Sequence, residues 1–448
     1  MHKRSLDELP QLLAQWLPAG ASGDVLVALS GGLDSTVLLH ALAPSYRSRH
    51  NVRVVHVHHG LHSDAERWEA ECARQAQALG LEFVTRRVRV PDNPPEGLES
   101  AARRARYDVL REMLRPKEAL LTAHHADDQL ETVLLALMRG SGVEGLAAMP
   151  RCQPFGAGWH VRPLLEWTRD EIEEWARARG LNWSHDPSND STRFDRNYLR
   201  AHIVPGLRAR WPSAAHSVVR SAAHLGDAAQ LLEEIAARDF ADASHGPCLR
   251  VAALERLSSA RRRNLLRYWL RAYGARAPST RKLASLEHDM LAAEDDRLPC
   301  VAWDDVEVRR HRGLLYCGPK LAPLEQFQIE WEWRTPLKIG ALPGILRAQI
   351  AHGRGLKRSA LPSCVQVRAR RGGERLRLPQ HAHRRELKKL LQDASVLPWW
   401  RDRLPLVFVG DTLIAVADLW IEASFAAGRD EEGVEIVWEG RPSLTAMK

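Results

Sequence analysis

Short apolar runs alternate with helix-like segments along the first half of the chain. Residues 25–29 read Val-Leu-Val-Ala-Leu without interruption, and residues 52–58 form a second run rich in β-branched residues. A strand that is apolar on both sides has to be buried on both faces, which is the situation of a strand in a parallel sheet covered by helices. We therefore expect an α/β fold for this part of the chain, built on a doubly wound parallel sheet.

The same pattern predicts the individual elements. Strands are expected at residues 25–29, 52–58, 81–90 and 119–122. Helices are expected at residues 36–42, 63–79, 99–114, 129–139 and 169–179. Gly80 follows the second helix as a C-terminal cap, and Thr168 precedes the last one as an N-cap.

Beyond Trp211-Pro212-Ser213 the alternation stops. An Ala/Leu/Arg-rich, helical stretch extends to about residue 295, and strand patterns return at residues 306–308 and 328–331. A chain of 448 residues has room for about three domains. We expect domains at residues 1–213, 214–345 and 346–448, the second mainly helical and the third a small α+β domain.

Positive charge is concentrated near the end of the chain. The net charge is +8, carried by 55 Arg and 9 Lys against 56 acidic residues, and the segment 367–403 alone has eleven Lys/Arg and four Asp/Glu. Such a local excess indicates binding to a polyanion.

The six cysteines are scattered and never form C-x-x-C, which predicts reduced thiols and argues against a zinc ribbon, a redox pair or a cysteine-bound iron–sulfur cluster. No apolar run approaches the length of a membrane span, and the first residues lack the apolar core of a secretory signal. We therefore expect a cytoplasmic protein that does not bind membranes.

The segment Ser30-Gly31-Gly32-Leu33-Asp34-Ser35 lies between the first expected strand and the first expected helix. Two glycines let the backbone approach a ligand closely, and the following helix N-terminus offers free N–H groups to an anion. The segment therefore predicts a phosphate-binding loop. It is not a Walker A loop, because none of the nine lysines follows a glycine.

A second polar cluster, His124-His125-Ala126-Asp127-Asp128, follows the fourth strand and opens a helix. His124 and Asp128 are four residues apart and share a helix face, so they could act as a base with its orienting partner or as metal ligands.

Two other patterns are interpreted more plainly. Gly140–Gly145 spells G-x-G-x-x-G but follows a helix, which indicates a helix-ending loop. His56, His58, His59 and His62 lack ligand-spaced partners, which favours a pocket lining over a metal site.

S-G-G-x-D-S after the first strand resembles the PP-loop of the N-type ATP pyrophosphatases, which split ATP into AMP and pyrophosphate. Within that group the chain resembles the tRNA(Ile)-lysidine synthetase family, densely over residues 22–210 and moderately near the C-terminus. The chain departs from this family at Tyr198-Leu199, where the resemblance implies a pair of smaller aliphatic residues. The resemblance rests on the runs 56–61, 124–142, 186–190, 196–200, 368–374, 383–390 and 398–401, and on Arg103, Arg106 and Tyr107.

This resemblance implies a Rossmann-like PP-loop catalytic domain, a tRNA-contacting middle domain and a basic tRNA-binding C-terminal domain. The implied reaction adenylates the wobble cytidine of a tRNA(Ile) whose anticodon is CAU, after which free L-lysine displaces AMP. Catalytic roles fall to Asp34, His124 and Asp128, with His124 or Asp128 as the base and Asp34 as the Mg²⁺ ligand. The residues expected to bind ATP are Ser30, Gly31, Gly32, Leu33, Asp34, Ser35, His58, Arg103 and Arg106. Those expected to bind tRNA are Arg196, Arg200, Arg368, Arg370, Arg371, Arg384, Arg385, Lys388 and Lys389.

Three other functions compete with this one. A PP-loop tRNA thiolase would share the loop but generally needs paired cysteines or an iron–sulfur cluster. A metal-dependent phosphohydrolase could be built on His124, His125 and Asp128, and a non-catalytic RNA-binding protein would need no phosphate loop. The sequence leaves the oligomeric state open, a homodimer included.

Overall fold

The computed structural model describes residues 5–60, 64–91, 97–184, 195–293, 297–340 and 342–445. The chain divides into two compact units, residues 1–232 and 233–448. The division falls within the 30-residue helix α10 (Ala214–Ala243), and the expected domain limit at residue 213 lies directly before this helix.

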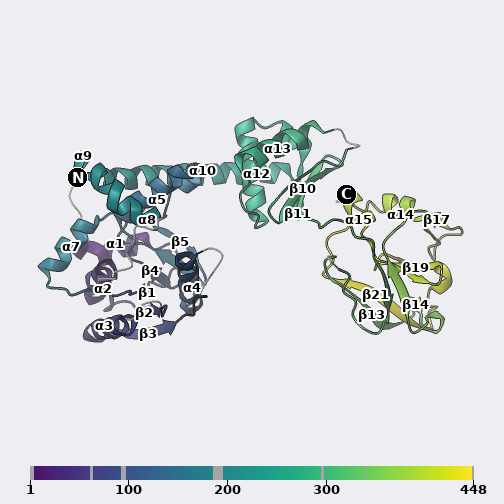
Figure 1. Ribbon diagram of the computed structural model, residues 1–448, viewed down its shortest axis with the longest axis horizontal. Helices are drawn as coiled ribbons and strands as arrows, with labels where there is room; N and C mark the ends of the chain where they lie inside the picture. Colours follow the sequence, from purple (N-terminus) through teal and green to yellow (C-terminus); the bar gives the residue numbers. More distant parts are fainter. Residues whose placement is uncertain are drawn as a thin grey trace. The chain divides into compact units, whose positions relative to one another are not determined.

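The first unit is built on a sheet with the strand order β3-β2-β1-β4-β6-β5 (Figure 1). Its strands pair in parallel except for β5, which runs antiparallel to β6, so the expected parallel sheet is confirmed. The strands are β1 (Val25–Ala28), β2 (Val52–His58), β3 (Glu82–Arg87), β4 (Ala119–Leu121), β5 (Cys152–Phe155) and β6 (Gly158–Val161). The helices and helical turns before α10 are η1 (Leu6–Glu8), α1 (Leu9–Trp16), α2 (Leu33–Tyr46), α3 (Ala65–Ala78), α4 (Leu98–Met113), α5 (Ala126–Met138), α6 (Val143–Leu146), α7 (Arg169–Ala178), α8 (Asp195–Tyr198), η3 (Leu199–Ile203, a π-helical turn) and α9 (Val204–Arg210).

Helices cover both faces of this sheet, which explains why its central strands are apolar throughout. Val25 and Val27 of β1 belong to the core that contains residues of α1, α2, α3 and α7. Leu26, between them, packs on the opposite face with Leu110 of α4. In Figure 1, α2 and α4 accordingly lie on opposite sides of β1. Alternate side chains of one strand thus enter two separate cores.

Several local features agree with expectation and others differ. Gly80 has φ +64 after α3, and Thr168 forms a capping box with Glu171 at the start of α7, as expected. Gly140, with φ +69, ends the segment after α5, so the helix-ending loop is also confirmed. Helix α2, expected at residues 36–42, is longer than expected: it begins at Leu33 and continues past Pro44 to Tyr46. The β5–β6 hairpin was not expected, because its strands are short and carry no clear alternation. His62 and residues 186–190 lie outside the described residues.

The second unit begins with a part that mixes helices and strands. Its antiparallel sheet has the order β7-β8-β11-β10-β9, and its core joins the sheet to the helices through Leu265, Trp269 and Leu286. The expectation of a mainly helical region is therefore incomplete, because short strands lie before the helices, at residues 244–250, as well as after them, where the strand expected at residues 306–308 is found. Its elements are β7 (Ser244–His245), β8 (Cys248–Arg250), α11 (Val251–Glu255), α12 (Ser259–Ala272), α13 (Thr280–Ala292), β9 (Cys300–Trp303), β10 (Val306–His311) and β11 (Leu314–Pro319).

The remainder of the second unit is the expected small α+β region. One sheet has the order β12-β15-β18-β19-β20 and another the order β13-β21-β14, and β16 pairs with β17. Trp400 is buried in the shared core, where it packs among apolar side chains. Strand β12, before the expected limit at 345, pairs with β15 after it. The elements are β12 (Gln328–Trp331), β13 (Ile345–His352), β14 (Leu356–Lys357), η4 (Arg358–Ala360), β15 (Val365–Arg368), β16 (Arg375–Leu376), β17 (Arg385–Glu386), α14 (Leu387–Asp393), α15 (Pro398–Arg401), β18 (Leu406–Val409), β19 (Thr412–Val416), β20 (Trp420–Ile421), η5 (Ala423–Phe425) and β21 (Glu432–Glu439).

All six cysteines lie in the described part of the chain, and each is a free thiol, as expected. Among the described helices, none combines the length and apolar character that crossing a membrane requires.

Candidate active site

The Ser30–Ser35 loop joins the carboxyl end of β1 to the start of α2. Gly31 has φ +83, a left-handed conformation that glycine adopts readily, and a Cβ there would lie 3.2 Å from Cys72 Sγ. Ser35 Oγ donates to the Gly32 carbonyl at 3.1 Å and accepts from the Ser30 N–H at 3.2 Å. The Ser30 hydroxyl lies 3.0 Å from Ser35 Oγ and can donate to it. The serine hydroxyls therefore hold the loop's shape from within.

The first turn of α2 remains open to an anion. Gly32 is the N-cap of this helix and supplies no side chain to accept the first N–H groups. Those N–H groups have no acceptor within the helix, and the helix dipole adds positive potential at the same place. The loop and helix together can therefore bind phosphate oxygens.

Asp34 is the second residue of α2 and faces the start of α5. Its Oδ2 lies 3.8 Å from His125 Nε2 and 3.5 Å from Arg169 Nη1. Its Oδ1 is buried and has no hydrogen-bond partner among the described residues. Burial raises the pKa of Asp34, although His125 and Arg169 act in the opposite direction. A carboxylate oxygen without a partner fits a hard cation, so Asp34 can hold Mg²⁺.

His125 forms the N-cap of α5. Its Nδ1 lies 3.3 Å from the Asp127 N–H, and Asp128 Oδ2 accepts the His125 N–H at 3.0 Å. This reciprocal cap explains why α5 begins at Ala126, earlier than the expected residue 129. His125 Nε2 then lies between two carboxylates, 3.5 Å from Asp128 and 3.8 Å from Asp34.

The charges of this group are mutually dependent. Burial works to lower the pKa of His125, but Asp128, Asp127 and Asp34 together raise it to about 9. Burial likewise opposes ionisation of Asp128, and His125 and neighbouring cations nevertheless hold the pKa of that carboxyl well below its usual range. Once charged, the His125 ring carries a proton on Nδ1 and pairs with Asp127 Oδ2, 3.6 Å away, instead of accepting the backbone N–H. At neutral pH the site thus holds an imidazolium beside the ionised Asp128 carboxylate.

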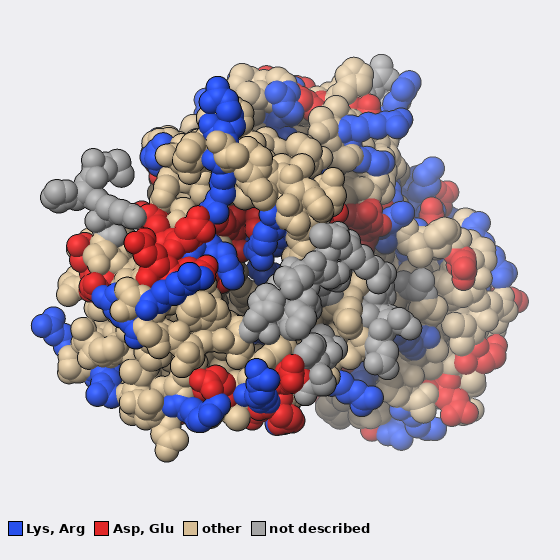
Figure 2. All heavy atoms as spheres, turned by 60° about the vertical axis from the view of Figure 1, so that its left-hand side comes forward, with Lys and Arg blue, Asp and Glu red and all other residues tan. Residues whose placement is uncertain are grey.

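Glu131 follows Asp128 by almost one turn of α5 and is only 1% exposed. It accepts from Arg196 Nε at 2.8 Å and from Arg200 Nε at 2.7 Å. The two arginines also approach Asp128 Oδ1, at 3.7 and 3.5 Å. Neither Nη1 makes a hydrogen bond to a described residue, so each guanidinium keeps one edge for a ligand. In Figure 2, Asp and Glu side chains likewise gather beside Lys and Arg in a band across one face.

His124 lies beside this cluster and has different partners. Its Nδ1 is 2.8 Å from Thr122 Oγ1, and its ring packs edge-on to His160 with the centroids 6.3 Å apart. Burial holds the pKa of His124 well below its usual range, and Asp128 opposes this only in part. His124 is therefore neutral where His125 is charged.

Arg103 and Arg106, which fall in the helix expected at residues 99–114, lie on α4. The guanidinium carbons of Arg103 and Arg106 stand 5.0 and 5.8 Å from the centre of the Tyr107 ring. Burial and the nearby Arg106 cation lower the pKa of His59 to about 4, which places Arg106 near the end of β2. Arg106 and the histidines at residues 56–59 therefore lie near each other at the carboxyl edge of the sheet.

His58 ends β2 and belongs to a group whose nitrogen and oxygen atoms could surround a cation. One atom each of His58, Glu66 and Glu69 lies within 4.8 Å of the others. Arg87 already donates to both carboxylates, at 2.6 and 2.8 Å to Glu66 and 2.7 Å to Glu69. His56 Nδ1 is instead within 2.9 Å of the Leu29 carbonyl. We therefore interpret the group as an ion-pair cluster centred on Arg87.

The basic residues near the C-terminus differ in exposure. Arg368 and Arg370 are only 15% and 14% exposed, and both face Glu374. Arg370 Nη1 also pairs with Asp402 at 2.8 Å. Arg384 and Arg385 are more exposed and approach Glu422 and Asp393. Arg371, Lys388 and Lys389 are exposed as well, and Arg371 Nη2 donates to Gln328 Oε1 at 2.6 Å.

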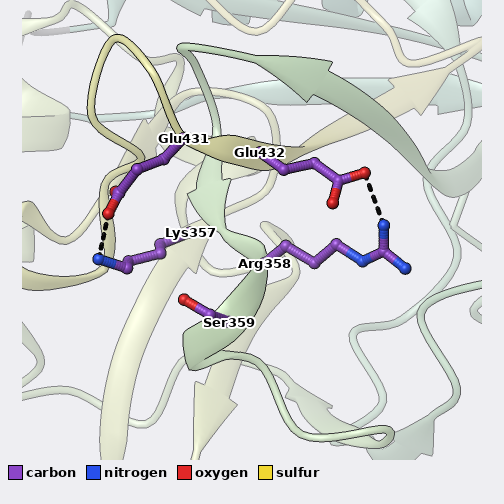
Figure 3. Close-up of a pocket in the computed structure, with 5 residues that line it drawn as sticks. All are labelled: Lys357, Arg358, Ser359, Glu431 and Glu432. Carbon is purple, nitrogen blue, oxygen red and sulfur yellow. Dashed lines mark hydrogen bonds and ion pairs between the residues drawn. The ribbon is translucent and has the colours of Figure 1, made fainter.

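A separate pocket of about 420 Å³ lies in the second unit (Figure 3). Its charged side chains neutralise each other in two ion pairs, Lys357 with Glu431 and Arg358 with Glu432, the latter at 2.6 Å. It contains none of the residues predicted to bind or react with a substrate.

The sequence analysis placed His125 and Asp127 in its polar cluster without giving either a role in the predicted reaction, and it did not single out Glu131 or Arg169. His125 could have been found from the capping pattern, because its N3 residue is the acidic Asp128. No local signal marks Glu131 or Arg169, since their partners lie 65 and 135 residues away in the chain.

Comparisons with known proteins match this arrangement along the whole chain. A PP-loop domain model matches residues 2–207, a TilS substrate binding domain model residues 249–316, and a TilS substrate C-terminal domain model residues 365–438. The tRNA(Ile)-lysidine synthase of Alkalilimnicola ehrlichii is 42% identical over 93% of this chain and 95% of its own. That of Coxiella burnetii is 38% identical over 92% of both chains.

A solved structure, the U34-tRNA thiolase NcsA from Methanococcus maripaludis with its [4Fe-4S] cluster, is 20% identical with a TM-score of 0.40. It covers 49% of this chain, which covers 79% of it. The matches to the lysidine synthases extend over nearly the full length of both partners, and the models of all three characteristic domains match in order. On these grounds the chain belongs to the tRNA(Ile)-lysidine synthase family.

Proposed function

We propose that this protein uses ATP to join L-lysine to the wobble cytidine of the CAU anticodon of tRNA(Ile). The reaction forms lysidine through an adenylated cytidine and releases AMP and pyrophosphate. Family membership supports the reaction, and one observation carries the assignment to this site. The phosphate-binding loop, with Asp34 at its end, faces the charged cluster of His125 and Asp128 across the carboxyl edge of a parallel sheet.

ATP binds at the loop in this proposal. The backbone N–H groups at the start of α2 receive its phosphates, in a loop whose shape the Ser30 and Ser35 hydroxyls hold, while Arg103 and Arg106 approach from α4 and His58 from β2. Asp34, whose Oδ1 has no hydrogen-bond partner among the described residues, would hold Mg²⁺. The ion would offset the negative charge that grows on the departing pyrophosphate.

Asp128 is our candidate for the group that receives the lysine ε-amine. It remains ionised, because His125 and the adjacent arginines stabilise its charge. An ionised carboxylate can orient the neutral ε-amine and take up the proton that the nitrogen loses once it has attacked the adenylated carbon, as AMP leaves. His124 lies next to it and is available to the adenylated base.

The tRNA is contacted at two places. Arg196 and Arg200 present their free edges near the reacting groups, and the exposed basic side chains of the C-terminal region bind phosphates elsewhere on the tRNA. We propose a catalytic domain at residues 1–213, a tRNA-contacting domain from residue 214 and a basic C-terminal domain whose limit, expected at residue 346, lies before β12 because that strand pairs with β15. We further propose that the protein works in the cytoplasm, where its substrates occur. Analytical ultracentrifugation tests whether it forms a homodimer.

Mass spectrometry tests the activity directly. The enzyme is incubated with ATP, isotopically labelled lysine and tRNA(Ile), and the nuclease fragments of the anticodon stem-loop are weighed. We expect a labelled lysine adduct on the wobble cytidine, absent without ATP and absent from the methionine tRNA that shares the CAU anticodon. An unmodified anticodon fragment under all conditions would refute the proposal.

A further inference from the structure

A continuous chain of hydrogen bonds connects His124 to Arg162 through side chains at the ends of strands β4 and β6. Thr122 follows β4 directly, and His160 lies on β6 opposite Leu120, so Thr122 and His160 point to the same face of the sheet. Thr122 Oγ1 lies 2.8 Å from His160 Nε2 and 2.8 Å from His124 Nδ1. One hydroxyl therefore joins the two rings.

The far end of the chain is a buried arginine. Arg162, two residues after His160, is 6% exposed and has its Nη2 3.1 Å from His160 Nδ1. Its Nη1 donates to the Pro150 carbonyl at 2.6 Å, and it forms no ion pair with a described carboxylate. Tyr107 and Phe155 pack against the His160 ring, each with centroids 5.7 Å away. These contacts shield the hydrogen bonds of His160 from solvent.

These partners determine the direction of every bond. A guanidinium can only donate, so His160 Nδ1 accepts and the proton of this neutral ring is on Nε2. His160 Nε2–H then donates to Thr122 Oγ1. The Thr122 hydroxyl has no acceptor other than His124 Nδ1 among the described residues, so its single proton is donated to that nitrogen. His124 must therefore carry its own proton on Nε2, the nitrogen on the opposite side of the ring from Thr122.

We propose that Arg162, His160 and Thr122 are positioning residues that fix His124 as a neutral donor of an Nε2–H hydrogen bond toward the bound substrates. The inference rests on the proposed function for the identity of those substrates, although the tautomer itself does not depend on it. His124 then cannot act as the base that takes the lysine proton, because its only lone pair is occupied by the Thr122 hydroxyl. It donates to an oxygen of the nucleotide or the adenylated base, and proton acceptance falls to Asp128.

Nitrogen NMR of the whole enzyme tests the tautomer without any turnover. With ¹⁵N-labelled histidine, the His124 resonances are identified by their loss in His124→Gln. We expect Nε2 to be protonated and Nδ1 unprotonated at neutral pH. A proton on Nδ1, or a charged ring, would overturn the inference even if the enzyme makes lysidine. If the wild type makes no lysidine but shows this tautomer, the proposed function fails and the inference about the relay stands.

Thr122→Val removes the relay hydroxyl at nearly constant shape, and Thr122→Ser restores a hydroxyl. We expect kcat for lysidine formation to fall about 10- to 100-fold in Thr122→Val, the effect typical of losing a partner that orients a functional histidine, with KM for ATP nearly unchanged. The His124 signals should show mixed tautomers. Thr122→Ser should recover both. An unchanged tautomer and kcat in folded Thr122→Val would contradict the relay.

Two substitutions at His124 separate donor from base. A Gln amide nitrogen can occupy the position of Nε2, whereas an Asn amide reaches only the position of Nδ1, and neither side chain is basic. We expect His124→Gln to retain activity within about tenfold of the wild type and His124→Asn to lose about 10²-fold or more. Equal, large losses in both variants would point to a base and reject the donor role.

Discussion

The exposed basic side chains of the C-terminal region allow the sharpest test of tRNA affinity. The perturbation is the triple variant Arg371→Ala, Lys388→Ala, Lys389→Ala. All three side chains are exposed, and neither lysine forms an ion pair with a described residue. Arg370 is left unchanged, because it is 14% exposed and pairs with Asp402, so its loss would damage folding as well.

The exposure of these residues sets the expected magnitude. If each side chain meets one phosphate, the variant loses three contacts, and the slope of log K against log salt should flatten by about 2–3 units. Between about 1 M and about 0.15 M salt, log salt changes by roughly 0.8, so affinity at the lower concentration should fall about 100-fold. That loss corresponds to ~2.7 kcal/mol of binding free energy.

Fluorescence anisotropy across a salt series measures this slope for full-length tRNA(Ile) and for a short anticodon stem-loop. We expect the loss for the full-length tRNA and a much smaller one for the stem-loop. The matched control removes three cations from the β13–η4 segment, Arg347→Ala, Arg354→Ala and Arg358→Ala, which each face a glutamate. Its slope should stay close to that of the wild type.

Two results would refute the reasoning. An unchanged slope in the triple variant would show that these side chains form only a solvated surface. An equal flattening in the control would show that net charge, and not the position of the contacts, governs affinity. Equal losses for the two RNAs would instead move the contact to the anticodon.

Four further predictions concern the catalytic unit. Asp34→Ala should lower pyrophosphate release from ATP plus tRNA about 10²–10³-fold, and near-normal release would remove Asp34 from the site. Asp128→Asn keeps an acceptor for the His125 N–H but removes the charge that pairs with His125 and the two arginines, so lysidine formation should collapse and the thermal midpoint should fall as well; full activity would assign Asp128 a purely structural role. Glu131→Gln breaks charge-assisted bonds to two arginines that are partly exposed, and urea denaturation should show a loss of about 2 kcal/mol. The raised pKa of His125 adds stability that is complete below pH 6.5 and is lost as pH rises through about 9, so unfolding free energy should fall over that range by up to about 3 kcal/mol, and His125→Asn should flatten the fall.

The sequence by itself determined the features that depend on neighbouring residues. The apolar run at residues 25–29 required burial on both faces, and the parallel sheet follows from that need. Gly31 and the serines of the loop predicted a phosphate-binding loop, and Gly31 indeed has the left-handed conformation that glycine favours. Thr168 capped its helix as predicted, since a cap is a contact across a few residues.

The tertiary structure alone decided which charges are available and which are engaged. Arg370 and Lys388 look equivalent in the sequence, yet the first is buried in an ion-pair group and the second is exposed. Likewise, nothing local brings Glu131 to Arg196, or His160 to Thr122. These pairs form because strands and helices distant in the chain pack against each other, and a pKa or a tautomer depends on the groups that packing places within a few ångströms.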